Sequence, residues 1–244
     1  SEMVAKVEKV ENALSLSPPR PWHLPTQGLA IFHGSGTVAR LSHYFLPRLL
    51  LQGKRVLFLD GANCADPRLL ERLARQRGVP FAQFNQQIEI ARAFTCFQLT
   101  ELVARVPRFL EDFPAQVLIV TAFPDLYFDE DVRDWDARVA FEQALANLRR
   151  LAGHSPSAAS YLAPADPKVG ATQRASLPLA VGVFSAAATF MPSPVRQRFF
   201  ERACAAAEVW EFSRGEDQRL ELNCTRALPR FDARGASSWC SRIR

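Results

Sequence analysis

Short apolar runs alternate with longer amphipathic stretches along most of this chain. The runs at 29–32, 55–59, 117–120 and 177–184 have the length and composition of buried strands, and 88–92 predicts a further brief strand. The run at 117–120 (VLIV) is entirely apolar, which is typical of a strand at the centre of a parallel sheet, where both faces are covered. The pattern therefore predicts several buried strands in one sheet.

The stretches between these runs predict helices. Their approximate positions are 38–52, 67–76, 97–110, 135–152 and 196–207, and Gly78 is placed to end the second. Because strands alternate with helices, we expect an α/β fold with a mainly parallel central sheet and helices on both faces. The last two alternating stretches, 208–213 and 219–225, flank a turn-like segment at 214–217 and predict a C-terminal β-hairpin.

These elements place a core domain at 28–225. Residues 1–27 hold a short helix with a heptad-like apolar stripe (Met3, Val7, Val10, Leu14), followed by a proline-rich linker. The stripe is expected either to pack on the domain's own core or to dock on a partner or second copy. Residues 226–244 form an arginine-rich tail. The segment 153–176 is rich in Ser, Ala and Pro without periodicity, and its role is left open.

Composition narrows the class of protein. The 244 residues are 48% hydrophobic and 23% charged, which supports a sizeable core and excludes wholesale disorder. No apolar run approaches the roughly 18 residues of a membrane-spanning helix, so we expect no membrane partner. Residues 1–11 lack a signal-peptide core, and the five cysteines show no metal-ligand spacing. We therefore predict reduced thiols in a cytoplasmic protein.

Three stretches carry a resemblance to a known family. Residues 28–34 (GLAIFHG) are a strand running into a glycine loop, 56–60 (VLFLD) are followed by a helix, and 91–94 (ARAF) are followed by Gln98 and Leu99. In this order they resemble the RecA/RadA recombinase family of P-loop ATPases, over roughly residues 28–225. The resemblance implies a RecA-like three-layer sandwich, with 117–120 as the Walker B strand.

The residues that the family uses for hydrolysis are replaced here. A working P-loop reads G-x-x-x-x-G-K-[ST], whereas residues 34–41 read GSGTVARL, so that Arg40 and Leu41 stand for the lysine and the magnesium-binding hydroxyl. By the same resemblance, Ala62 stands at the position of the water-activating acid and Thr121 at that of the Walker B aspartate. We interpret the chain as a divergent paralogue that kept the fold and lost hydrolysis, and expect no cofactor and no metal.

The glycine-bearing turn at 34–37 could keep an anion-binding site although hydrolysis is lost. The backbone of Gly34, Ser35, Gly36 and Thr37, together with Arg40, offers groups that bind anions, although a plain strand-to-helix turn explains the same glycines. Four histidines are scattered without a catalytic triad or a metal cluster.

The distribution of charged residues indicates candidate contacts for nucleic acid and for cations. The net charge is +5, and the candidate nucleic-acid contacts are Arg196, Arg198, Arg226, Arg230 and Arg234. The acidic run 125–136 repels phosphates, so we interpret it as a solvated acidic face, with a hard-cation site as the alternative.

The sequence thus predicts a catalytically inactive RecA-like accessory or scaffold protein of DNA recombination or repair. It acts through a protein partner or a second copy, with DNA as a further candidate partner. One alternative is an ATP-binding or weakly hydrolysing P-loop NTPase with a regulatory role. Another is a DNA-binding protein that uses the arginine-rich C-terminus.

Overall fold

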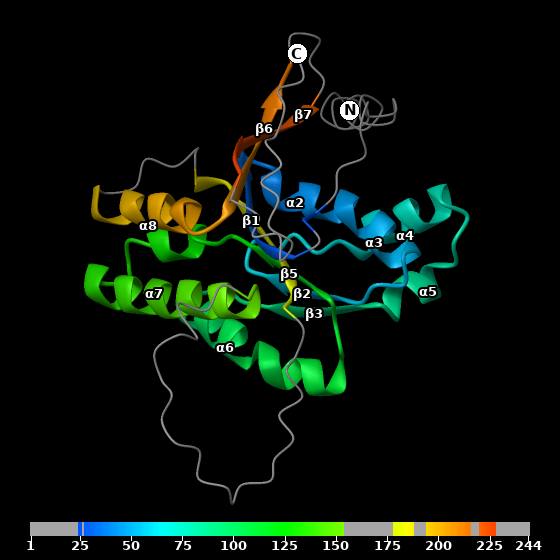
Figure 1. Ribbon diagram of the computed structural model, residues 1–244, viewed down its shortest axis with the longest axis horizontal. Coiled ribbons are helices and arrows are strands. Elements are labelled where there is room, and N and C mark those ends of the chain that lie inside the picture. Colours follow the sequence, from blue (N-terminus) through cyan, green and yellow to red (C-terminus); the bar gives the residue numbers. More distant parts are fainter. Residues whose placement is uncertain (1–23, 26, 154–177, 188–193, 216–219, 228–244) are drawn as a thin grey trace, which may run out of the picture.

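The computed structural model describes residues 24–25, 27–153, 178–187, 194–215 and 220–227 (Figure 1). Seven strands form one sheet in the order β3-β2-β4-β5-β1-β6-β7. Neighbouring strands are parallel throughout, except for the antiparallel pair β6 and β7. This arrangement confirms the predicted α/β class and the mainly parallel sheet. The strands are β1 (Gly28–Gly34), β2 (Val56–Asp60), β3 (Ile88–Arg92), β4 (Val117–Thr121), β5 (Ala180–Ser185), β6 (Glu208–Arg214) and β7 (Leu220–Arg226).

Helices cover both faces of the sheet (Figure 1). One layer holds α6 (Cys96–Asp112), α7 (Asp134–Leu151) and α8 (Pro194–Ala205), and the short 3-10 turn η2 (Asp125–Phe128) packs with it. The other layer holds α2 (Val38–Leu41), the 3-10 turn η1 (Ser42–Phe45), α3 (Leu46–Leu51), α4 (Pro67–Gln76) and α5 (Phe81–Asn85).

Alternate residues of each strand feed the two cores. On β1, Leu29 and Ile31 pack towards α6–α8, while Phe32 packs towards the opposite layer. Phe32 stacks on Phe184 of β5 with ring centroids 4.9 Å apart. All five residues of β4 are buried, as expected for a strand covered on both faces.

Two local predictions were wrong. The single helix predicted at 38–52 is divided into α2, η1 and α3. Pro47 lies at the start of α3, where its missing N–H costs nothing, whereas the same proline inside one long helix would remove a backbone hydrogen bond. The sequence pattern also did not predict α5, which is only five residues long.

Several predicted elements lie outside the described residues. They are the helix and most of the linker within 1–27, nearly all of the segment 153–176, and the tail beyond residue 227. β6 and β7 pair antiparallel as a hairpin requires, but their connection at 216–219 is not described, so the hairpin itself stays a prediction.

A buried hydroxyl pair joins η2 to the helices beneath it. Thr100 Oγ1 lies 2.9 Å from the carbonyl of Cys96 and 3.2 Å from that of Ala140, and 2.8 Å from the Tyr127 hydroxyl. The single hydroxyl hydrogen of Thr100 goes to a carbonyl, so Tyr127 donates to Thr100.

We expect Tyr127→Phe to lower the free energy of unfolding by about 1 kcal/mol, because the variant loses one buried hydrogen bond and keeps the ring packing. Denaturant unfolding of Tyr127→Phe, Thr100→Val and the double variant measures this. Strictly additive losses in the double variant would contradict a direct bond between the two hydroxyls.

Candidate functional site

The carboxyl ends of the parallel strands bring the sequence-predicted positions together. In the sheet register Asp60 of β2 lies opposite Thr121 of β4, and Thr121 lies opposite Phe184 of β5. The backbone N–H of Ala62 donates to Thr121 Oγ1 at 3.1 Å. Ala62 and Thr121, which the resemblance pairs with two catalytic acids, are therefore neighbours in space. Carboxyl ends of parallel strands are the usual place for ligand sites in open α/β sheets.

Asp60 is a fully buried carboxylate that organises this edge. Its Oδ1 accepts from the Cys64 N–H at 3.0 Å and from Thr121 Oγ1 at 3.1 Å, while Oδ2 accepts from the Ala65 N–H at 2.9 Å. Arg92 of β3 adds an ion pair at 3.8 Å. Every oxygen of Asp60 is thus used inside the protein, which gives this carboxylate a structural role.

The loop after β2 follows from these bonds. Gly61 lies so close to β4 that an added Cβ would sit 2.6 Å from the Thr121 carbonyl oxygen, so a larger residue does not fit. Asn63 has φ of 51°, a conformation that asparagine tolerates better than most residues. Burial, with Asp60 nearby, raises the pKa of the Cys64 thiol to about 12, so this thiol stays protonated at neutral pH.

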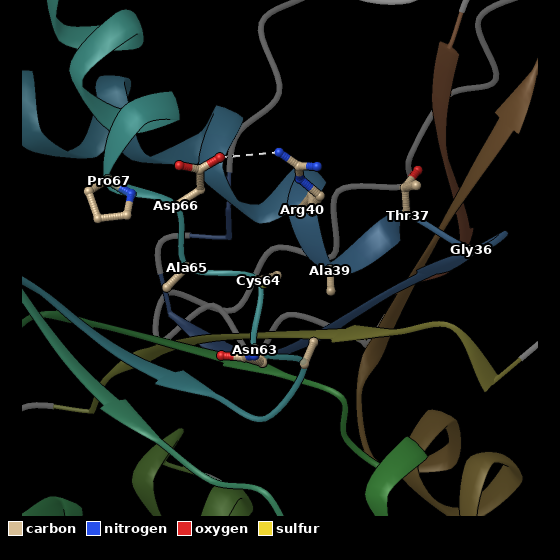
Figure 2. A pocket seen from close by; sticks show the side chains of 10 residues that line it. Gly36, Thr37, Ala39, Arg40, Asn63, Cys64, Ala65, Asp66 and Pro67 are labelled. Carbon is tan, nitrogen blue, oxygen red and sulfur yellow. Dashed lines mark hydrogen bonds and ion pairs between the residues drawn. The ribbon is translucent and has the colours of Figure 1, made fainter. Parts of the chain in front are cut away.

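A pocket opens between this loop and the segment after β1 (Figure 2). Its volume is about 510 Å³. One wall comes from the β1–α2 segment and the start of α2, and the other from the loop between β2 and α4. The residues that line it are Gly36, Thr37, Ala39, Arg40, Ala62, Asn63, Cys64, Ala65, Asp66 and Pro67.

An ion pair joins the two walls. Arg40 and Asp66 lie 3.2 Å apart, and Figure 2 shows the guanidinium pointing towards the carboxylate. Asp66 also caps α4, because its Oδ1 accepts from the N–H groups of Arg68 and Leu69. The Arg40 guanidinium therefore already has an anionic partner within the protein.

His43 makes a second link between the walls. Its Nδ1 lies 3.1 Å from the Arg40 carbonyl, and its Nε2 accepts from the Asp66 N–H at 3.2 Å. This pattern assigns the hydrogen to Nδ1, so the ring is neutral. Burial lowers the pKa of His43, and this outweighs Asp60 and Asp66, which favour the charged ring.

The candidate phosphate loop is only partly in the pocket. Gly36, Thr37 and Arg40 line it, whereas Gly34 is buried against β6 and its Cβ would meet the Phe212 carbonyl oxygen at 2.9 Å. Two loop N–H groups are bonded within the segment, from Thr37 to Ser35 at 2.7 Å and from Arg40 to Thr37 at 3.0 Å. Leu41, at the magnesium-hydroxyl position, is buried in the apolar core.

Arg196 was wrongly predicted as a nucleic-acid contact. Only 4% of this residue is exposed, and its Nε donates to Asp134 Oδ1 at 2.9 Å. The rest of its guanidinium donates to the carbonyls of Tyr127, Asp129 and Val132, so the charged end of the side chain is engaged inside the protein. Its burial and bonding remove Arg196 from the candidate contacts.

The other candidate arginines differ in position. Arg198 is exposed on α8. Arg226 is exposed at the end of β7 and donates to the Cys204 carbonyl at 3.3 Å. Arg230 and Arg234 lie outside the described residues, so their role as contacts stays a prediction.

The acidic run is not a uniform solvated face. Asp125 is largely covered and accepts from Ser185 Oγ at 2.6 Å and from the Ala186 N–H at 2.8 Å, and burial raises its pKa. Asp134 pairs with Arg196. The remaining acids, Asp129, Glu130, Asp131 and Asp136, are exposed, as the sequence predicts.

Sequence reasoning missed the residues that join the pocket walls. Asp66 followed by Pro67 is a recognisable helix start, and this signal was available, although nothing in it indicates a partner at Arg40. His43 and Cys64 carry no sequence signal, because their contacts arise only from the packing of η1 against the loop after β2.

No group of three or more His, Cys, Asp or Glu side chains among the described residues is arranged to hold a metal ion. No helix in the described ranges is long and apolar enough to cross a membrane.

Comparison with known proteins gives no support to the resemblance inferred from the sequence. No protein-family model matches the chain, and no curated protein matches it.

Arg196→Ala should lower the free energy of unfolding by about 2–3 kcal/mol, because buried carbonyls and Asp134 lose their donor. Arg198→Ala, two residues along the same helix and exposed, should change it by no more than about 0.5 kcal/mol. Denaturant unfolding compares the two variants. Equal small losses would contradict the structural role of Arg196.

His43 should make the stability depend on pH. Its pKa is lower in the folded state than in the unfolded state. As the pH falls below the ordinary histidine range, His43 therefore becomes protonated in the unfolded chain while it stays neutral in the folded chain. The contribution of His43 is therefore present above that range and is lost towards acidic pH.

His43→Gln keeps a donor and an acceptor but does not titrate. We expect the stability difference between wild type and this variant to shrink or reverse on acidification, measured by urea unfolding at a series of pH values. His33, whose pKa burial also lowers, is present in both proteins and cancels. A difference that stays constant with pH would contradict the assignment of a neutral His43.

Proposed function

We propose that this chain is a RecA-like domain that no longer hydrolyses nucleotides and serves as an accessory or scaffold protein of DNA recombination or repair, acting through protein contacts. The pocket at the carboxyl edge of the sheet carries this proposal. It lies between the segments after β1 and β2, where the resemblance puts a nucleotide, and its walls hold Arg40 and Ala62 at the positions that the resemblance gives to the lysine and the water-activating acid.

The order of the elements supports the RecA-like part of the proposal. The glycine loop follows β1, the Ala62 position follows β2 and Thr121 ends β4, and the parallel sheet directs all three to one edge. The parallel pairing of β2 with β4 brings the Ala62 N–H within hydrogen-bonding distance of Thr121, as the resemblance expects of these two positions.

The chemistry of the walls supports the loss of hydrolysis. Leu41 is buried and has no oxygen for magnesium, and Thr121 uses its hydroxyl to bond Asp60. Arg40 is paired with Asp66, so a phosphate would have to compete with a carboxylate already in place. The role in recombination or repair rests on the family resemblance alone.

A second candidate is a regulatory P-loop protein that still binds ATP or hydrolyses it weakly. The observation that favours it is the open pocket itself, whose volume of about 510 Å³ falls within the usual range for small-molecule sites. Nucleotide binding separates the two candidates.

We expect Mg-ATP to leave the melting temperature of the purified protein unchanged, and no magnesium-dependent ATP turnover above background. A ligand that binds the folded state would raise the melting temperature by mass action. Thermal unfolding over a series of Mg-ATP concentrations tests binding, and phosphate release tests turnover.

Asp66→Asn is the matched variant, because asparagine still caps α4 but frees Arg40. A saturable shift in the wild type would contradict the proposal and favour the regulatory NTPase. If neither protein shifts, the accessory role is tested by the proteins that co-purify with the native chain. Repeated recovery without any recombination or repair protein would count against it.

A further inference from the structure

An exposed apolar patch lies where α7 and α8 begin. Trp135 and Val139 on α7 and Val195 on α8 are large apolar residues on the surface, and Trp135 is 69% exposed. We call these three residues the α7–α8 patch. The two helices run side by side and in the same direction in Figure 1, with both N-terminal ends on the left.

Two ion pairs join α7 to α8, and the second indicates on which sides of the helices Trp135 and Val195 lie. Arg196 pairs with Asp134, and Arg202 donates to Glu142 at 2.8 Å. Residues seven apart on a helix differ by only about 20° in direction. Trp135 lies seven residues before Glu142, and Val195 seven before Arg202, so both lie on the sides that the second ion pair joins.

The surroundings of the patch are acidic. Asp129, Glu130, Asp131 and Asp136 are exposed around the start of α7, and none of them forms an ion pair with another described residue. The nearby exposed arginines are Arg133 and Arg138 on the same stretch and Arg198 on α8, three against these four acids. A segment that combines aromatic residues with arginines would match both the patch and its rim.

Residues 228–244 are such a segment. They carry Phe231, Trp239 and Ile243, with four arginines against one aspartate (Arg230, Arg234, Arg242, Arg244 and Asp232). The described chain reaches Ala227, and the preceding Arg226 contacts the carbonyl of Cys204 at the C-terminal end of α8. The arginine-rich segment therefore starts beside the helix that carries half of the patch.

The length of chain is sufficient. The twelve residues of α8 span about 18 Å. From Arg226 to Trp239 an extended chain covers up to about 43 Å. Trp239 can therefore reach the N-terminal ends of α7 and α8 without any movement of the sheet, and Phe231, about 17 Å from Arg226 at full extension, can reach along most of α8.

We propose that the arginine-rich segment 228–244 docks on the α7–α8 patch of its own chain, with its aromatic residues on Trp135 and Val195 and its arginines beside the acidic rim. The docked segment shields the patch, and its arginines are then engaged and not free for phosphates. This inference concerns residues outside the pocket and is independent of the proposed loss of hydrolysis.

Brief trypsin treatment of the full chain tests docking, because cleavage after Arg230 and Arg234 needs an undocked segment. We expect these sites to be cut roughly tenfold more slowly than in a synthetic 228–244 peptide, since cleavage follows the undocked population. Mass spectrometry of the released peptides gives the rate. Trp135→Ser with Val195→Ser should bring the rate close to that of the peptide.

Two further variants make the test specific. Asp129→Asn, Glu130→Gln and Asp131→Asn together should raise the rate in part, and added salt should do the same in the wild type by screening the arginines. Leu51→Ser, which removes an exposed apolar residue of α3 in the opposite helix layer, should leave the rate unchanged.

Three results would overturn the proposal. The first is a wild-type segment cut as fast as the peptide, and the second is protection that survives the loss of Trp135 and Val195. The third is protection that disappears on dilution, which would place the segment on a second copy. Thermal unfolding of each variant establishes that the fold is retained, as expected for substitutions at exposed positions.

Discussion

A buried carboxylate is stable only when its oxygens are supplied with donors, and Asp60 imposes this requirement on the whole carboxyl edge of the sheet. Three donors come from the loop after β2 and from β4, and Arg92 of β3 adds an ion pair. The backbone at 61–65 must curl around Asp60 to provide these N–H groups. The same curl puts Asp66 at the start of α4, where it meets Arg40 and His43 across the pocket.

Thr121 shows how this requirement affects function. Its hydroxyl donates to Asp60 and accepts from Ala62, so β2, β4 and the intervening loop are joined without any metal ion. An aspartate at position 121 would place two carboxylates about 3 Å apart, and one of them would then have to bind a cation or take up a proton. Threonine removes that need.

The sequence predicted the burial of a residue correctly where the burial follows from the local apolar pattern. It was misleading where burial depends on contacts with residues far away in the sequence. Four consecutive apolar residues were enough to predict β4, and the alternation of runs predicted the parallel sheet. Arg196 was misjudged because an arginine on an amphipathic helix is usually exposed, whereas here carbonyls of the segment after β4 enclose it. The sequence could not show that Ala62 donates to Thr121 or that Arg40 pairs with Asp66, because both contacts arise only when separate loops meet in three dimensions.

Arg196 also explains why the outer surface at α7 and α8 is suited to binding. A planar guanidinium that bonds two carbonyls and Asp134 fixes the start of α8 against the start of α7 in one geometry. Trp135 and Val195 are the immediate neighbours of the paired residues, so their backbones are held before anything docks on them. A surface that is already ordered loses less entropy when it is covered, and a modest apolar contact can then suffice. The buried arginine would thus assist the proposed docking through the exposed residues that it positions.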